Sequence, residues 1–344
     1  PSDGAFQVWT VSGTAEPTIA ESTISGGGNW TVIGHADFDG DGGEDLLLKH
    51  NVSGDFSVLD LSSPGVPVQG SNINPPADWE FSHLGDFNGD GRTDVLVRNE
   101  VGGLLGVWQM NGTGVPTYGT SFSFANNLEI LHIGRFDGDA NDDLLVRNTS
   151  TGGVQVYEMN GTSVSAQSTV VSSLSGSWQF QAAADFDGDG NDDALWRNTS
   201  HGRVAVWDFD GSSMPTFGSS IALDLAWDIE AIADLTGEGT ADLLLRRDST
   251  DHAAVWNMNG TATPSFGSSF TAPSGLTVLG TIEGEVGEGD NIVWQNEITG
   301  DIGIWDISGT ANQPGAGSTT IAGHDPDLTV HLSETSSYPT WDWI

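Results

Sequence analysis

The chain has 344 residues, of which 48 are acidic and nine are basic, so its formal net charge at pH 7 is −39. Such a charge repels nucleic acids and anionic membranes, and no apolar run approaches the roughly eighteen residues of a spanning helix. We therefore expect neither nucleic-acid binding nor membrane insertion, and the absence of cysteine excludes disulfides and thiol redox chemistry.

Bulky residues recur at nearly constant spacing along the chain. Steps of 49 or 50 residues connect a set that we call the bulky column: Trp9, Leu59, Trp108, Tyr157, Trp207, Trp256 and Trp305. A period near fifty, built from short alternating runs and turns, is typical of a β-propeller or a solenoid. Counted through both ends, Trp305 and Trp9 are 48 residues apart, so the repeat closes on itself and favours the propeller.

One repeat, residues 178–217, shows the expected elements in order. A short run from Trp178 leads into an Asp/Gly loop, residues 194–197 predict an apolar strand, and residues 198–202 supply a turn. Residues 204–209 predict a third strand, and the Asp210-Gly211 pair predicts a hairpin turn before the fourth. Bulky residues occupy both faces, as expected for a four-stranded blade that packs between two neighbours.

The turn between the first and second strands carries the chemistry. In the first, second and fourth repeats it reads DFDGDGGED, DFNGDGRTD and DFDGDGNDD over residues 37–45, 86–94 and 185–193. Oxygen-bearing side chains fall at loop positions one, three, five and nine, glycines allow the turn at four and six, and position seven offers a carbonyl. The predicted ligands are Asp37, Asp39, Asp41, Gly43 and Asp45; Asp86, Asn88, Asp90, Arg92 and Asp94; and Asp185, Asp187, Asp189, Asn191 and Asp193.

This pattern suits calcium, which takes six to eight hard oxygen ligands. A single Asp-Gly stretch is usually a solvated turn, but three copies in register favour a metal site, because closely held carboxylates repel one another without a cation. Magnesium fits less well, because it requires near-ideal octahedral geometry and retains its waters.

The remaining loops depart from the pattern step by step. In the third repeat Arg135 replaces the first acid, around residue 283 the register is lost, and the closing repeat has no acidic cluster. We expect three firm calcium sites in the loops above and two weaker ones. The ligands of the weaker sites are Asp137, Asp139, Asn141 and Asp143 in the third repeat, and Asp234, Glu238, Thr240 and Asp242 in the fifth.

The two chain ends read as complementary halves of one repeat. Residues from about 327 to 344 are similar to the first half of a unit, and residues 1–21 to the second half. A solenoid would instead need capping repeats with polar outer faces. The sequence therefore predicts an all-β fold, a single domain over residues 1–344. It is a seven-bladed β-propeller of four-stranded antiparallel blades, in which N- and C-terminal strands pair in one blade and remove free sheet edges.

The acidic loops, together with the strands at residues 95–99 and 107–112, resemble FG-GAP/VCBS-type repeats over essentially the whole chain. Proteins with such repeats include the integrin α-subunit propeller and seven-bladed fungal and bacterial lectins. The resemblance implies that the DxDxDGxxD loops bind calcium on one face of the propeller. The family serves adhesion, sugar binding and surface architecture, so the resemblance alone does not identify a ligand.

Three functions remain open at this point. The first is a secreted, calcium-stabilised binding module of lectin type for neutral carbohydrate, and the second is a structural or adhesive unit that contacts other surface proteins. The third is a polysaccharide-active enzyme such as a lyase. It is disfavoured because the anionic substrates of such enzymes require positive charge in the cleft, and this chain is strongly negative. We therefore expect no catalytic residues and no cofactor besides Ca²⁺. Sites with dissociation constants of roughly 10⁻⁴ to 10⁻³ M would stay empty in the cytosol, so we expect an extracellular or cell-surface location.

Overall fold

The computed structural model of the chain describes residues 5–10, 18–23, 29–62, 67–247, 249–272, 275–282, 289–305 and 319–321. These residues form strands and turns without helices, so none of them belongs to a helix that could cross a membrane. The all-β prediction is therefore confirmed for the described chain.

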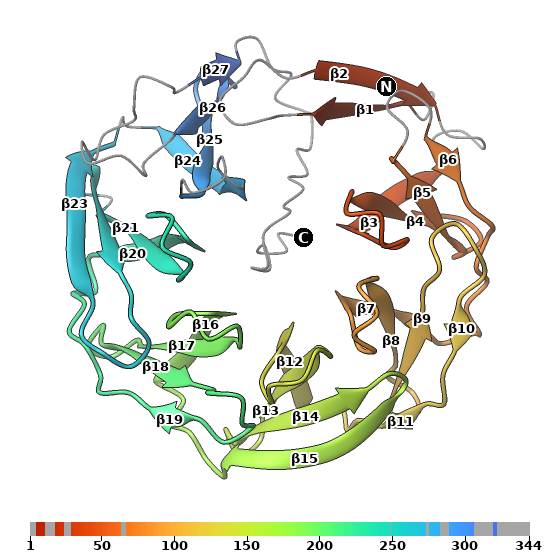
Figure 1. The fold of residues 1–344 in the computed structure, drawn as a ribbon, viewed down its shortest axis with the longest axis horizontal. Helices are drawn as coiled ribbons and strands as arrows, with labels where there is room; N and C mark the ends of the chain where they lie inside the picture. Colours follow the sequence, from red (N-terminus) through yellow and green to blue (C-terminus); the bar gives the residue numbers. More distant parts are fainter. Residues whose placement is uncertain are drawn as a thin grey trace. The chain divides into compact units, whose positions relative to one another are not determined.

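Six of the sheets are antiparallel meanders of four strands in chain order, which we number as blades one to six (Figure 1). Blades one to three contain β3 (Trp30–Ala36), β4 (Asp45–His50), β5 (Phe56–Asp60) and β6 (Val68–Gln69); β7 (Glu80–Gly85), β8 (Asp94–Asn99), β9 (Leu104–Gln109) and β10 (Thr117–Tyr118); and β12 (Leu128–Gly134), β13 (Asp143–Asn148), β14 (Val154–Asn160) and β15 (Ser163–Val171). A short extra strand in blade two, β11 (Phe122–Ser123), also pairs with β9.

Blades four to six repeat the same order. They contain β16 (Trp178–Ala184), β17 (Asp193–Asn198), β18 (Val204–Asp208) and β19 (Thr216–Phe217); β20 (Asp228–Ala233), β21 (Asp242–Arg247), β22 (His252–Asn257) and β23 (Ser265–Thr271); and β24 (Leu276–Ile282), β25 (Asn291–Asn296), β26 (Ile302–Trp305) and β27 (Thr319–Ile321). In all six blades the first strand shifts its register against the second by one residue at the same place, between positions such as Val32 and Gly34. This repeated bulge bends each first strand in the same way.

The prediction of seven blades is wrong for the described chain, which contains six. β1 (Ala5–Thr10) and β2 (Thr18–Thr23) pair with each other as a separate two-stranded sheet. Their expected partners at 327–344 lie outside the described residues, so no pairing of the two termini closes a blade among the described strands. In sequence, the stretch 327–344 differs from blades one to five in lacking the nine-residue acidic loop that joins their first and second strands.

The described chain forms two compact units. The first contains β1 to β15 together with residues 211–214, and the second contains β16 to β27. Within each unit most of the large hydrophobic clusters join two neighbouring blades, while two smaller clusters lie within blade one and within blade six. In the first unit Phe38 and Val58 of blade one pack in a cluster with Val95 and Trp108 of blade two. Similar clusters join blades two and three, four and five, and five and six.

Four members of the bulky column belong to these clusters between blades: Trp108, Tyr157, Trp256 and Trp305. The six members of the column in the complete blades are at most 6% exposed, and each sits at the same register opposite the second residue of its second strand, as Trp108 sits opposite Val95. Because these rings and Leu59 are buried against neighbouring strands, they stabilise the stack of blades and are not ligand platforms. Core faces on both sides of each meander are the hallmark of a propeller blade.

Candidate metal centres in the acidic loops

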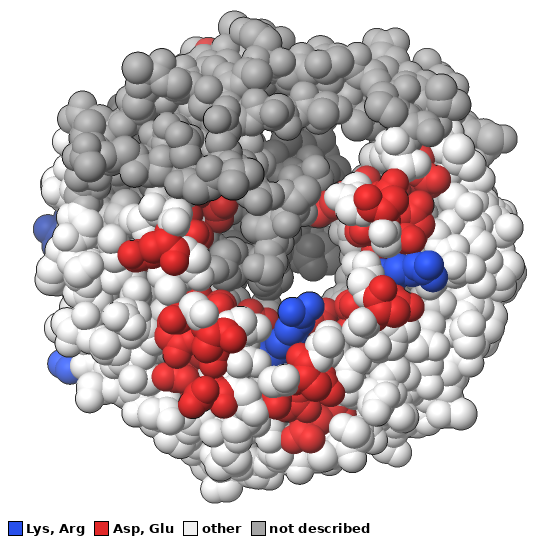
Figure 2. Space-filling view, viewed as in Figure 1, with Lys and Arg blue, Asp and Glu red and all other residues white. Residues whose placement is uncertain are grey.

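Two acidic loops bring three carboxylates close enough to hold one ion. In blade one these are Asp37, Asp39 and Asp45, at loop positions one, three and nine, and in blade four Asp185, Asp187 and Asp193 occupy the same positions. In each triad one oxygen per carboxylate lies within 4.8 Å of the others. Figure 2 shows acidic side chains gathered in separate patches on the viewed face, over loops that follow the first strands.

The first aspartate of the loop shapes the turn around itself. In blade four Asp185 accepts the backbone N–H groups of Gly188 at 2.6 Å through Oδ1 and of Gly190 at 2.8 Å through Oδ2. Both glycines have positive φ, 84° and 88°, a conformation that a side chain would disfavour. Asp37 makes the same bonds to Gly40 and Gly42 in blade one. The glycines predicted at positions four and six therefore allow the backbone to wrap the carboxylate.

The ninth-position aspartate is buried and holds two strands together. Asp193 is 1% exposed, and its carboxylate accepts the N–H of Phe186 at 3.0 Å and the N–H of Phe209 at 2.9 Å. The bond to the residue sixteen positions later recurs in all five loops, at 2.8 to 3.1 Å. This aspartate therefore ties the loop to the end of the third strand as well as completing the triad.

The aspartates at the fifth loop position accept hydrogen bonds from the backbone at the seventh position. Asp41 accepts the N–H of Gly43 at 2.7 Å, and Asp189 accepts the N–H of Asn191 at 2.8 Å. Neither aspartate belongs to the carboxylate triads. Their role as ligands, and that of the seventh-position carbonyls, stays a prediction.

Among the described residues, the other three loops do not gather three carboxylates in this way. In blade two Asn88 stands at the third position and bonds Asp90, while Asp86 caps the loop through Gly91 at 2.8 Å. The side chain of Arg92 reaches the preceding loop, where its Nε donates to the carbonyl of Asp39 at 3.1 Å. Arg92 therefore adds a positive charge beside the blade-one triad, while its carbonyl stays the predicted ligand.

Loops three and five keep part of the pattern. In blade three Asp137 and Asp139 each accept the N–H two residues later, at 3.0 and 2.7 Å, and Asp143 is fully buried. In blade five Asp234 accepts the N–H groups of the next turn, and Thr236 donates its hydroxyl to Asp242 at 2.9 Å. The remaining predicted ligands in these loops are Asn141, Glu238 and Thr240.

Burial makes these carboxyl groups hard to ionise in the absence of a cation. Burial raises the pKa of Asp45, Asp94 and Asp242 to about 7 and that of Asp143 and Asp193 to about 8, partly offset by the backbone N–H groups and increased by neighbouring acids. Burial also raises the pKa of Asp39 and Asp187. A bound divalent cation would reverse this preference, because its charge favours the ionised carboxylates.

A fourth carboxylate near each triad was missed in the sequence. Asp60 raises the pKa of Asp39 and Asp45 by its negative charge, and Asp208 does the same to Asp187 and Asp193. Both residues directly follow a bulky-column residue at the end of the third strand. An aspartate directly after the bulky-column residue is therefore the sequence signal that could have identified Asp60 and Asp208.

The donor sets fit a hard divalent cation. Each triad presents carboxylate oxygens only, and glycine-bearing loops leave room for further carbonyl or water ligands. In blade two the Oδ2 atom of Asp94 is buried without a hydrogen-bond partner, which is an acceptor that a cation would satisfy. Bound calcium would supply positive charge that rigidifies the loop, and Asp37, Asp39 and Asp45, or Asp185, Asp187 and Asp193, would hold it.

The loops are also tied to the next blade along the chain. The position-one carbonyls of Asp37 and Asp86 accept the N–H groups of Thr93 and Asp142, both at 2.8 Å. The next carbonyl, that of Phe38, accepts the N–H of Gly112 at 2.7 Å. An ion that orders one loop would therefore also stabilise its contact with the neighbouring blade.

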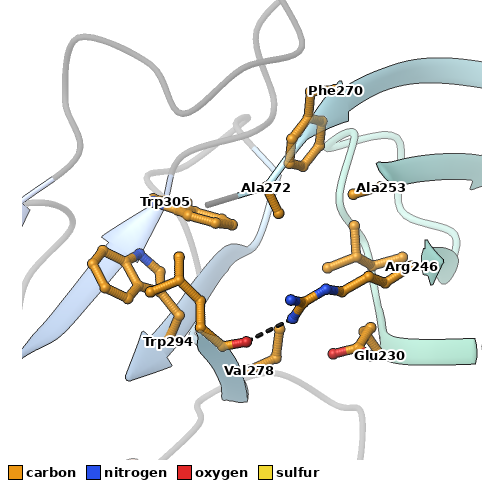
Figure 3. A pocket seen from close by; sticks show the side chains of 10 residues that line it. Glu230, Arg246, Ala253, Phe270, Ala272, Val278, Trp294 and Trp305 are labelled. Carbon is orange, nitrogen blue, oxygen red and sulfur yellow. Dashed lines mark hydrogen bonds between the residues drawn. The ribbon is translucent and has the colours of Figure 1, made fainter. Parts of the chain in front are cut away.

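A small enclosed cavity lies between blades five and six, away from the loops (Figure 3). Its volume of about 20 Å³ is room for one water, so it is a packing defect rather than a ligand site. Trp294 and Trp305 line it from blade six, and Arg246 from blade five donates to the carbonyl of Leu276 at 2.6 Å. The arginine therefore bridges the two blades through the backbone.

Comparison with known protein families supports the interpretation of the loops. Residues 86–146 and 135–196 match the family model of the FG-GAP-like repeat. This part of the chain, residues 86–196, carries FG-GAP-like repeats. The matched segments span the second, third and fourth acidic loops, and each runs from the acidic loop of one blade of the β-propeller to the second strand of the next blade.

Solved structures share the fold at low sequence identity. They include prolyl oligopeptidase B from Galerina marginata, with a TM-score of 0.55, 11% identity and coverage of 95% of this chain and 53% of that one. A prolyl endopeptidase structure gives a TM-score of 0.54, 12% identity and coverage of 94% and 50%. The structure of BBS1N in complex with ARL6DN gives a TM-score of 0.50 and 11% identity, with coverage of 88% of this chain and 84% of that one. The chain spans about half the length of the two peptidases, and no curated protein sequence matches it.

Proposed function

We propose that this chain is a calcium-stabilised extracellular binding module that recognises neutral carbohydrate. The observation that carries the proposal is the pair of carboxylate triads, each built into a loop that contacts the next strand or blade. Weak calcium sites of this kind fill only where calcium is plentiful, which supports a location outside the cell. Calcium then serves the scaffold, and recognition belongs to other surfaces of the blades.

The charge of the chain narrows the ligand class. With a net charge of −39, it repels nucleic acids, anionic lipids and uronate-rich polysaccharides. Neutral sugars carry no charge penalty, and they bind through hydroxyl hydrogen bonds and stacking on aromatic rings. The same charge argues against a lyase, so we propose that the chain is not an enzyme; its likeness to prolyl peptidases concerns the fold alone.

Exposed rings on outer strands favour a second candidate, adhesion to a surface protein. Tyr118, Phe217 and Phe266 are 49 to 74% exposed, and each packs edge-on against the bulky-column tryptophan of its blade, at 5.1 to 5.6 Å. Rings held in this way are common anchors of protein interfaces. Phe217 and Phe266, which stand on the neighbouring blades four and five, would suit a protein partner better than a sugar.

A glycan array in calcium-containing buffer tests the first function against the second. The array should show binding to at least one neutral glycan, and chelation should weaken that binding if the loops order the blades. Silence on every neutral glycan would remove the carbohydrate proposal and leave adhesion as the better candidate. Because the array presents many glycans at once, the sugar does not have to be chosen beforehand.

A further inference from the structure

Blade one contains an open groove at the end opposite its acidic loop. The groove has a volume of about 610 Å³ and lies where β3 starts, β4 ends and β6 runs along the outside. Its lining is more polar than apolar and includes Trp30, His50, Ser53, Asp55, Gln69 and Asn72. The groove is wide open to solvent, so a ligand would be held on one side only, whereas the space between blades five and six has room for about one water.

An aromatic wall stands on one side of the groove. The rings of Trp30 and His50 meet edge-on with their centroids 4.9 Å apart. His50 takes the place of the asparagine that ends the second strand in blades two, three, four and six. Its Nδ1 lies 3.1 Å from the backbone nitrogen and 3.0 Å from the hydroxyl oxygen of Ser53, so the turn after the strand fixes the orientation of the ring.

A carboxylate with spare acceptor capacity stands beside it. Asp55 accepts the Ser53 hydroxyl at 2.8 Å through Oδ2, and its Oδ1 atom is covered and has no hydrogen-bond partner. A carboxylate oxygen can accept about two hydrogen bonds, so Oδ2 keeps one acceptor for a ligand in the groove. The amides of Gln69 and Asn72 add donors and acceptors on the β6 side.

We propose that this groove is a binding site for a neutral pyranose. A sugar would lay its C–H face on Trp30 and direct hydroxyl groups to Asp55 and Gln69. A neutral ligand is favoured because no lysine or arginine is among the described residues that line the groove. The inference rests on the proposed carbohydrate function and assigns it to one place in the fold.

Blade six provides an internal comparison. There Thr299 donates to Asp301 at 2.7 Å, the counterpart of the Ser53–Asp55 bond. The counterpart of Trp30 is Leu276, however, and that of His50 is an asparagine. The serine or threonine bond to aspartate is thus a feature of the turn.

Trp–His ring pairs also occur in blades four and five, Trp178 with His201 and Trp227 with His252. There Arg203 and His252 stand where blade one has Asp55, so among the six described blades the combination of a ring pair with this carboxylate distinguishes the groove.

The test measures sugar binding by the full chain in calcium buffer. Saturation-transfer NMR with glucose, galactose, mannose, fucose and N-acetylglucosamine identifies a bound sugar, and calorimetry then gives its Kd. Asp55→Asn and Gln69→Ala should each raise Kd about ten-fold or more, the effect of losing one good hydrogen bond. The matched control Asp301→Asn should leave Kd within about two-fold. Melting temperatures show whether each variant is folded. If Asp55→Asn does not fold, Gln69→Ala still tests the groove, because Gln69 lies on an outer strand.

The possible outcomes separate this inference from the proposed function. Binding that is unaffected by Asp55→Asn and Gln69→Ala would overturn the groove and leave the carbohydrate function standing elsewhere on the chain. Equal losses in both groove variants and in Asp301→Asn would also overturn it, because the effect would then be non-specific. No binding to any of the five sugars would overturn the groove, and an array that is silent as well would overturn the carbohydrate function with it.

Discussion

Removal of calcium should lower the thermal midpoint of the protein by an amount that two sites can account for. A ligand bound only to the native state stabilises it by RT ln(1 + [L]/Kd). With a Kd on the order of 10⁻⁴ M and 10 mM calcium, each site contributes about 2.7 kcal/mol. The two triads together should therefore contribute about 5 kcal/mol.

The length of the chain converts this free energy into a temperature. Unfolding entropy near 2.1 cal/mol/K per residue gives about 0.7 kcal/mol/K for 344 residues. Each occupied triad should then raise the midpoint by about 4 °C, and both together by about 8 °C. Predicted sites in the other loops would add to this value.

Differential scanning fluorimetry with 10 mM calcium or excess chelator measures the shift, and variants assign it. Asp39→Ala and Asp187→Ala each remove one oxygen ligand of a triad, together with the single bond that each accepts from the backbone, at 3.1 Å. Each variant should lose about 4 °C of the calcium-dependent shift, and the exposed control Glu80→Gln should lose none. An unchanged midpoint on chelation, or a full shift in the double variant, would refute the assignment of calcium to the triads.

Two further predictions concern groups inside the blades. In chelator, Asp193→Ala should lower the free energy of unfolding by about 2 to 4 kcal/mol, because it leaves the buried N–H groups of Phe186 and Phe209 without an acceptor. The control Asp189→Ala, at an exposed position, should cost less than about 1 kcal/mol. Equal denaturant midpoints of the two variants would contradict the structural role of the two Asp193 bonds. Burial, with a smaller effect of His83, lowers the pKa of His132 to about 3, so the folded state keeps the ring neutral. The contribution of the neutral His132 ring to the free energy of unfolding should be complete above its unfolded pKa near 6.5 and should fall by about 3 kcal/mol at pH 4.5. Between pH 7.5 and 4.5 the His132→Gln variant should therefore lose about 3 kcal/mol less stability than the unsubstituted protein. Parallel pH profiles of the two proteins would contradict this role of His132.

Much of the blade architecture was readable from residue types. The period of the bulky column, the alternation of turns and apolar runs, and the glycines of the acidic loops each depend on local geometry, which a short stretch of sequence specifies by itself. The strands at 193–198 and 204–208 followed as expected, and the positive φ of Gly188 and Gly190 explains why the loop pattern needs glycine.

Other features required the tertiary structure. The sequence by itself determined that the chain is an all-β array of repeated blades with acidic turns, because turns, alternation and spacing are encoded within each repeat. Only the folded structure decided that six blades are complete, that Asp60 and Asp208 approach the triads, and that Trp30, Asp55 and Gln69 share one groove. These residues come from separate strands, and their meeting depends on sheet register and packing, which no single stretch of sequence contains.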